Sequence, residues 1–512
     1  MRTRKALINS IINILSFFVA FIPNIILRKT FLDSLGSDIL GLSSLYTNII
    51  GWISIVEMGV GTAIVYSLYK PFADNDQNEI RAYIRFYGEL YKKIGLIVLG
   101  AGVLISPCIR FFIKGNIDLK LATIGFLIYL LNSFLTYMFT HRLCILNVAQ
   151  EEFKITIGTT ISKLLIAIIQ FVFLKFKPNF LIYALIQVVV NLIYYIIINI
   201  YITRKYQWLN SGEGTLDGEV KNNLLNNVKA LFMHKIGGLV VLSTDNIVIS
   251  KFVGLVELAK YTNYYTIISS LQTLITKGLS GITASIGNML TDDDKEKAYD
   301  IHKKVFFMNF WIVSFIVISL YNTLNQFVAL WVGEKYFLDR FTFIVILLNT
   351  YFASMRGSVE RFQEGSGNYR QDRYAPLCEA AINLISSLML VQHIGLAGVF
   401  VGTLISNFTV IFWTKPYVVY KYVFDRKLIE YFKMYFKYVI IAIIPLIVTN
   451  YCTIAFKYSY TVKSFIINCS INVVVINLIY IIIFSKSQEF RYYVNIFMKI
   501  VKKNNKKIKN EA

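Results

Sequence analysis

Long apolar runs separated by short polar stretches fill most of the sequence. Crossing hydrocarbon takes about 20 mostly apolar residues in a helix, which satisfies its own backbone hydrogen bonds. The pattern predicts an all-α integral membrane protein. It has about 14 candidate membrane spans, at residues 6–27, 40–68, 94–113, 120–140, 155–174, 180–202, 230–252, 258–287, 305–332, 341–355, 374–392, 394–414, 438–456 and 464–484.

The second half of the pattern repeats the first at a nearly constant offset. The Asn-Ile-apolar-apolar-x-Lys pattern of residues 24–29 recurs 222 residues later at 246–251, and the offset falls to 216 near the end of each copy. Each copy holds six spans, an even number, so both should insert the same way up, as in parallel-repeat transporters. Matches at an offset of 218 include Gly36, Leu40, Tyr46 and Asp76 with Gly254, Leu258, Tyr264 and Asp294.

The repeat predicts two parallel-oriented six-helix lobes plus two C-terminal helices. The expected parts are an N-terminal lobe at 1–205, a cytoplasmic linker at 206–229, a C-terminal lobe at 230–425, two appended helices at 426–485 and a basic cytoplasmic tail at 486–512.

Charge decides the orientation. A net charge of +22 would suggest a nucleic-acid partner in a soluble protein, but here the basic residues lie mainly in short loops and at the C-terminus. With a cytoplasmic N-terminus, 36 of the 52 Lys and Arg residues fall on the cytoplasmic side and 13 on the other. This bias satisfies the positive-inside rule, so both termini should be cytoplasmic. Membrane lipids are expected partners and nucleic acid is not.

Signals for metal or phosphate chemistry are weak. The five cysteines are scattered, and no G-x-x-x-x-G-K-[ST] loop is present. The acidic runs at 74–76 and 292–294 resemble clusters that hold metal-bound sugar nucleotides. Helix capping is the favoured interpretation, because Asp76 with Glu79 and Asp293 with Glu296 have capping-box spacing. We expect no catalytic residue, no metal and no cofactor, and therefore no enzyme.

Ionisable residues within predicted spans are functional candidates, because burying charge in a membrane is costly. They are Glu57, Lys163, Lys235, Asp245, Lys277 and Glu379, with Arg28 as a weaker candidate at the end of the first span. A cationic cluster suits a phosphate or pyrophosphate group. Mutual neutralisation between helices, for example of Lys277 by Glu57 or Asp245, is the alternative.

Other polar side chains have simpler explanations. Arg356 with Glu360 and Arg361 with Glu364 have the spacing of local helical pairs, and the helix of the weak tenth span is expected to continue through them. Lys251 is expected to extend toward lipid headgroups. His141 and Arg142 could guide an anionic substrate or mark the membrane interface. The abundant tyrosines could stack on sugars or form interfacial aromatic belts.

Several motifs resemble those of Wzx-type polysaccharide repeat-unit flippases, in the multidrug/oligosaccharidyl-lipid/polysaccharide exporter superfamily. They are Asn24-Ile25-Ile26-Leu27-Arg28, Leu35-Gly36-x-x-x-Leu40-Gly41-Leu42, Glu57-Met58-Gly59-Val60-Gly61 and Asp245-Asn246-Ile247-Val248-Ile249.

The resemblance implies transport of an undecaprenyl-pyrophosphate-linked oligosaccharide across a bacterial cytoplasmic membrane, for capsule, O-antigen or exopolysaccharide synthesis. It implies alternating access through a cationic central cavity. The implied lining includes Lys235, Lys277, Asp245, Glu57 and Arg28, while Lys163 rests on its intramembrane charge alone. Polysaccharide polymerase and glycosyltransferases of the same pathway are implied partners.

Two other classes stay open. A cation-coupled multidrug exporter of the same fold would favour an acidic cavity. A membrane-integral glycosyltransferase or polymerase would normally need an outer loop or an acidic catalytic pair, and the predicted outer loops are short.

Overall fold

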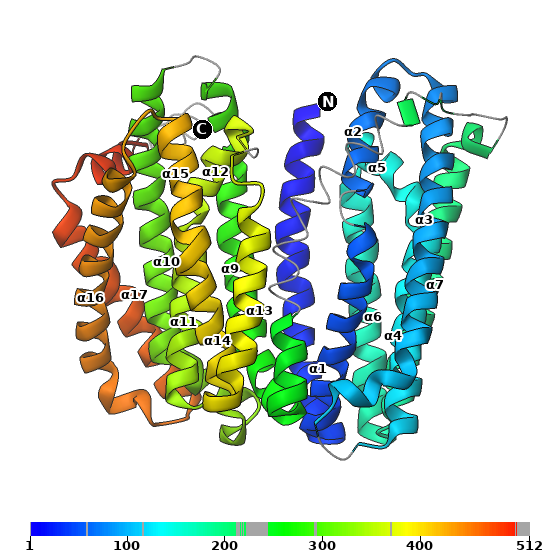
Figure 1. The fold of residues 1–512 in the computed structure, drawn as a ribbon, viewed down its shortest axis with the longest axis horizontal. Coiled ribbons are helices and arrows are strands. Elements are labelled where there is room, and N and C mark those ends of the chain that lie inside the picture. The colour runs from blue at the N-terminus through cyan, green and yellow to red at the C-terminus, as the bar shows by residue number, and fades with distance from the viewer. Residues whose placement is uncertain are drawn as a thin grey trace, which may run out of the picture. The chain divides into compact units, whose positions relative to one another are not determined.

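Most of the residues that the structure describes lie in helices, and none of them lies in a strand. The computed structural model describes residues 2–57, 60–114, 117–210, 216, 218, 220–221, 244–290, 294–368, 371–496 and 498. Contacts divide the chain into two compact units, residues 1–260 with 387–399 and residues 261–386 with 400–512 (Figure 1). We call these unit 1 and unit 2. The lobe boundaries expected from the sequence stay a prediction.

Unit 1 is built from long helices that pack lengthwise. Helix α1 packs on α6, α4 packs on α3 and α7, and α6 packs on α7. A shorter helix, α2, packs on α3 and α5. The elements are α1 (Arg2–Ile53), η1 (Ser54–Glu57), α2 (Val60–Ala73), α3 (Gln77–Ile105), η2 (Ser106–Phe112), α4 (Leu119–Phe139), η3 (His141–Leu143), α5 (Cys144–Val148), α6 (Glu152–Phe176), α7 (Phe180–Lys205), η4 (Gln207–Asn210) and η5 (Ile249–Val253).

Unit 2 is organised around α10, which packs on α11, α12, α16 and α17. Its aromatic core joins these helices, as in the stacked pair of Phe310 and Tyr438 with ring centroids 4.5 Å apart. From α9, which begins just before unit 2, the elements are α9 (Leu255–Leu290), α10 (Lys295–Trp331), η6 (Glu334–Tyr336), α11 (Arg340–Met355), α12 (Gly357–Ser366), α13 (Ala375–Ile394), α14 (Leu396–Ser406), η7 (Asn407–Ile411), α15 (Phe412–Tyr422), α16 (Leu428–Lys457) and α17 (Val462–Phe484).

The helices present the surface of a multi-pass membrane protein. Among the described residues, 11 helices are long and apolar enough to cross a membrane. Large apolar side chains point outward on them, such as Ile197 at 61% exposure and Ile482 at 73%, as expected for lipid contact. The number 14 is not established. The segment Leu15–Ile53 counts once although Gly36 interrupts it, α9 is not among the eleven, and much of the run at 230–252 lies outside the described residues.

Glycines matched by the repeat break the helices at matched points. Gly36 interrupts α1 with φ 84° and ψ 173°, and Gly254 separates η5 from α9 with φ 132° and ψ 166°. Glycine tolerates positive φ without the steric cost of a side chain. The matched residues Tyr46 and Tyr264 are both fully buried. The Tyr46 hydroxyl donates to the Ala122 carbonyl at 2.5 Å, and that of Tyr264 bonds to the Asn325 amide oxygen at 2.6 Å.

The predicted cap at Asp76 and both predicted local ion pairs are present. The Asp76 carboxylate accepts from the backbone of Asn78 and Glu79 at the start of α3. Its repeat partner, Asp294, caps α10 by accepting from Lys297, and Asp293 lies outside the described residues. Two pairs follow the end of α11, where the helix continues as α12 as predicted: Arg356 with Glu360 at 2.8 Å and Arg361 with Glu364 at 2.7 Å.

Within unit 2, α16 and α17 pack on α10 through buried amides as well as apolar contacts. The Asn322 amide on α10 donates to Thr449 of α16 at 2.9 Å and to Asn472 of α17 at 2.8 Å. One turn along, the Asn468 amide donates to Gln326 at 2.7 Å. Between helices in a membrane such bonds fix register, since no water replaces a lost partner.

Candidate functional site

The predicted cavity residues that the structure describes lie on several helices and in both units. Arg28 is half-buried on α1, Lys163 is exposed on α6, and Lys277 is exposed on α9 within unit 2. Lys235 lies outside the described residues. Glu57 and Asp245 both belong to unit 1. The assignment of these six side chains to one cavity stays a prediction.

The segment that carries Asp245 is held against the first half of the chain. Asp245 is 7% exposed, and the neighbouring Asn246 amide donates to Asn48 on α1 at 3.1 Å. The Ser250 hydroxyl donates to the Phe112 carbonyl at 2.8 Å. The Lys251 ammonium lies 3.9 Å from the centroid of the Phe111 ring, a cation–π contact that holds a side chain expected to reach toward headgroups.

Close contact between two backbone segments explains Gly41, which belongs to the Leu35-Gly36-x-x-x-Leu40-Gly41-Leu42 motif. A Cβ added at Gly41 would lie 2.2 Å from the carbonyl oxygen of Leu255. Such a distance is far inside van der Waals contact, so only glycine fits without movement. Gly41 therefore lets the backbone after Asp245 lie directly on the second half of α1.

Within the described residues of unit 1, the Glu57 carboxylate is held by a tyrosine and not by a lysine. The Tyr91 hydroxyl on α3 donates to Glu57 Oε1 at 2.6 Å. Tyr87, one turn earlier, packs edge-to-face on Tyr91 with ring centroids 4.3 Å apart. A Cβ at Gly61 would lie 3.0 Å from the Tyr87 hydroxyl, so the second glycine of the Glu57–Gly61 motif allows α2 to approach these rings.

These tyrosines form one wall of a pocket of about 740 Å³ in unit 1. We call it the tyrosine pocket. Its polar atoms are hydroxyls, a carboxylate, an amide and a thiol, distributed over four helices. Its lining residues are Gly61, Val65, Tyr66, Tyr69, Tyr87, Tyr91, Thr140, Leu143, Cys144, Asn147, Glu152, Ile155, Thr156 and Thr159.

The chemistry of the tyrosine pocket suits a neutral polyhydroxylated ligand or an organic cation. Aromatic faces stack on sugar rings and attract cations, and convergent hydroxyl and amide groups fix orientation. The abundance of tyrosine predicted sugar stacking or interfacial belts without indicating the four tyrosines of this pocket. A signal was available, because Tyr66 with Tyr69 and Tyr87 with Tyr91 have the spacing of residues on one helical face.

The fold follows from these features together with the comparisons below. A bundle of membrane-length helices in two units, with a glycine break repeated between the halves, has the fold of transporters in the multidrug/oligosaccharidyl-lipid/polysaccharide exporter superfamily, as the following comparisons show.

Three solved structures define this likeness. One is "Lipid II flippase MurJ, inward closed conformation", with a TM-score of 0.70 at 14% identity over 94% of this chain and 99% of that chain. An inward-facing multidrug resistance MATE family transporter has a TM-score of 0.61 at 13% identity over 80% and 98%. A superfamily transporter from Pyrococcus furiosus has a TM-score of 0.54 at 12% identity over 81% and 95%. No protein-family model and no curated protein matches the sequence.

Proposed function

We propose that this protein is a flippase that moves an undecaprenyl-pyrophosphate-linked oligosaccharide from the inner to the outer leaflet of a bacterial cytoplasmic membrane. The extent of the fold likeness carries the proposal. The lipid II flippase structure covers 94% of the chain, and the MATE family transporter structure covers 80%. This difference is expected if the flippase has counterparts of α16 and α17 and the multidrug transporter has none.

The tyrosine pocket supports a glycan-bearing substrate. Its volume of about 740 Å³ lies within the range of about 300–1,000 Å³ usual for ligand pockets. Tyr66 and Tyr69 are 75% and 50% exposed, so their rings are accessible for stacking on sugars. Asn147 and Glu152 supply polar partners for sugar hydroxyls.

In this proposal the charged candidates act on the pyrophosphate. Lys235 and Lys277 attract it, while Glu57 and Asp245 position or neutralise those cations between transport cycles. Arg28 and Lys163 are secondary candidates for the same route. The oligosaccharide would serve capsule, O-antigen or exopolysaccharide synthesis, with glycosyltransferases supplying the substrate and a polymerase consuming it.

Depletion of the protein tests the proposal. Completed lipid-linked units should collect on the cytoplasmic leaflet, where an added impermeant glycosidase or lectin does not reach them in intact spheroplasts. Tyr66→Ala should slow their appearance on the outer leaflet at an unchanged protein level. Tyr458→Ala is the matched control, because Tyr458 is also 75% exposed but lies outside the pocket. Normal outer-leaflet appearance after depletion would reject the flippase function.

Export of organic cations is the second candidate. The pocket combines tyrosine faces with the Glu152 carboxylate, an arrangement that also attracts cations. Cells that express the protein would then accumulate less of a cationic dye, and Glu152→Gln would restore the accumulation. Unchanged dye accumulation together with trapped lipid-linked units would favour the flippase.

A further inference from the structure

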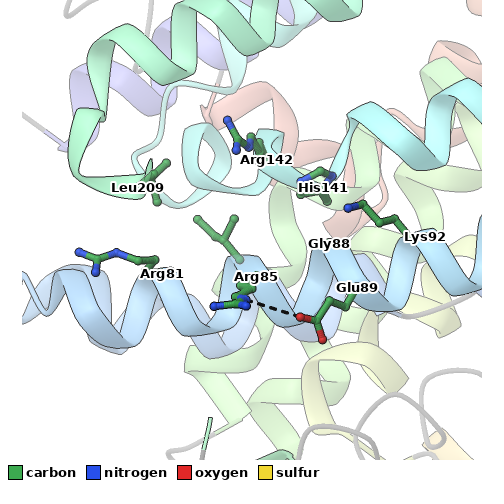
Figure 2. Close-up of a pocket in the computed structure, with 9 residues that line it drawn as sticks. Arg81, Arg85, Gly88, Glu89, Lys92, His141, Arg142 and Leu209 are labelled. Atoms are coloured by element: carbon green, nitrogen blue, oxygen red, sulfur yellow. Dashed lines mark ion pairs between the residues drawn. The ribbon is translucent and has the colours of Figure 1, made fainter. Parts of the chain in front are cut away.

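A second cavity in unit 1 has a different chemistry from the tyrosine pocket. Its volume is about 360 Å³, and it lies between α3, η3 and η4. Charge distribution along the sequence predicts that these segments face the cytoplasm. We call it the cationic cavity (Figure 2). It is lined by Arg81, Ile84, Arg85, Gly88, Glu89, Lys92, His141, Arg142 and Leu209.

Positive charge dominates this lining. Arg81, Arg85, Lys92 and Arg142 are cations, and Glu89 is the one carboxylate among the lining residues. Glu89 pairs with Arg85 at 3.6 Å (Figure 2), but both side chains are more than half exposed, where solvent weakens such a pair. A net excess of cations therefore lies around one small cavity.

The guanidinium groups of Arg81 and Arg142 have N–H donors that are available to a ligand. The Arg81 Nε atom is buried and makes no hydrogen bond to any residue that the structure describes. Among the described residues, the Arg142 side chain donates one hydrogen bond, from Nη1 to the Thr203 hydroxyl at 3.1 Å. A guanidinium carries five N–H donors in a planar fork that matches phosphate oxygens.

The cations of α3 and η3 line the same cavity because η3 packs closely on α3. At Gly88 an added Cβ would lie 3.0 Å from the ring of His141, so glycine allows η3 to lie against α3. Burial is the largest cause that lowers the pKa of His141 from 6.5 to about 4, and the charges of Arg142 and Lys92 contribute to the same shift. The imidazole is therefore neutral at pH 7 and neither adds to nor offsets the cationic charge.

The second copy of the repeat carries different residues at the positions that match this cavity. Aligned on the caps Asp76 and Asp294, the offset of 218 pairs Arg81 with Tyr299, Gly88 with Phe306 and Lys92 with Phe310. Phe306 and Phe310 are fully buried and stack on Tyr438 of α16. Two of the matched positions in unit 2 thus carry buried aromatic rings that pack on α16, whereas in unit 1 they line a cationic cavity.

We propose that the cationic cavity binds a phosphate or diphosphate group at the cytoplasmic end of unit 1, separate from the tyrosine pocket. Its planar guanidinium groups and Lys92 supply the charge-assisted hydrogen bonds that such a group needs. The group belongs either to a free anion or to the headgroup of an acidic phospholipid. This inference does not depend on the transported substrate.

Binding of inorganic pyrophosphate to the full-length protein tests the proposal. The protein is placed in nanodiscs of phosphatidylcholine and titrated by calorimetry at fixed ionic strength. The variant Arg81→Gln/Lys92→Gln should bind pyrophosphate at least about tenfold more weakly than wild type, since the loss of one charge-assisted bond corresponds to about a tenfold change. The control Lys70→Gln/Lys93→Gln removes two exposed charges outside the cavity and should bind like wild type.

Adding a phosphatidic acid fraction to the nanodiscs identifies the source of the phosphate. If the headgroup occupies the cavity, pyrophosphate affinity falls in wild type and in the control but not further in the cavity variant. If the affinity of wild type is unchanged, a free anion is the ligand. Absence of pyrophosphate binding to wild type, or equal weakening in both double variants with all proteins eluting as folded monodisperse species, would overturn the proposal.

Discussion

Replacing Gly41 with alanine should destabilise unit 1, whereas the same change at Gly51 should not. At Gly41 the new Cβ would lie 2.2 Å from the Leu255 carbonyl oxygen, which is 1.2 Å closer than the 3.4 Å where ordinary contact begins. At Gly51, on the same helix, an added Cβ meets nothing within 4 Å. The obstacle at Gly41 is backbone, so a rotamer change does not relieve it.

The expected magnitude follows from two opposing effects. Alanine in place of glycine stabilises a helix interior by roughly 0.5–1 kcal/mol, and this gain is common to both sites. Overpacking at Gly41 costs about 1–3 kcal/mol. The free energies of unfolding of the two variants should therefore differ by about 1–3 kcal/mol, with Gly51→Ala at or above wild type.

Equilibrium unfolding in mixed micelles of a mild detergent and dodecyl sulfate measures this difference. Proteolysis supplies a local readout, because the segment that carries Asn246 and Ser250 should be cleaved faster in Gly41→Ala. If Gly41→Ala and Gly51→Ala have equal stability and equal cleavage rates, the close approach of Leu255 to α1 is wrong.

Two further perturbations test other contacts. Asn322→Ala removes the donor shared by Thr449 and Asn472 and should lower the free energy of unfolding by about 1–2 kcal/mol. The control Ser470→Ala, at an exposed hydroxyl bonded within its own helix, should have a free energy of unfolding within about 0.5 kcal/mol of wild type. Equal losses in the two variants would contradict the amide network. For His141 the folded pKa of about 4 lies below its ordinary value of 6.5, so its contribution to stability is complete above pH 6.5 and is lost as pH falls toward 4. The apparent melting temperature of wild type should accordingly fall more than that of His141→Gln between pH 7 and 4.5, and parallel curves would show that His141 is not buried as described.

The sequence was sufficient for the features that depend on local pattern. Apolar run length predicted membrane helices, and the 218-residue offset matched Gly36 to Gly254, which both adopt positive φ. Carboxylate spacing predicted the cap at Asp76 and the pairs of Arg356 with Glu360 and Arg361 with Glu364. Each of these features involves residues within a few positions of one another or a symmetry of the pattern.

Local sequence pattern did not predict the features that depend on packing between helices far apart in the chain. Neutralisation of Lys277 by Glu57 stays a prediction, and nothing in the sequence indicated that Glu57 accepts from Tyr91, 34 residues away. The bond requires η1 to pack on α3, and Gly61 lets α2 approach the neighbouring Tyr87 hydroxyl. Similarly, Arg142 was marked as a possible guide for anions, but its proximity to Arg81 and Lys92 required the packing of η3 against α3.

The basic residues of α3 are predicted to have two separable roles. Orientation in the membrane depends on how many Lys and Arg residues a loop carries near its spans and hardly on which helical face they occupy. A phosphate site depends on the face. Arg81, Arg85 and Lys92 recur at four and seven residues, close to one helical face that includes Gly88, whereas Lys93 lies outside the cavity lining. Removing Lys92 or Lys93 changes the topology signal equally, so a difference between them in anion binding reports the cavity alone.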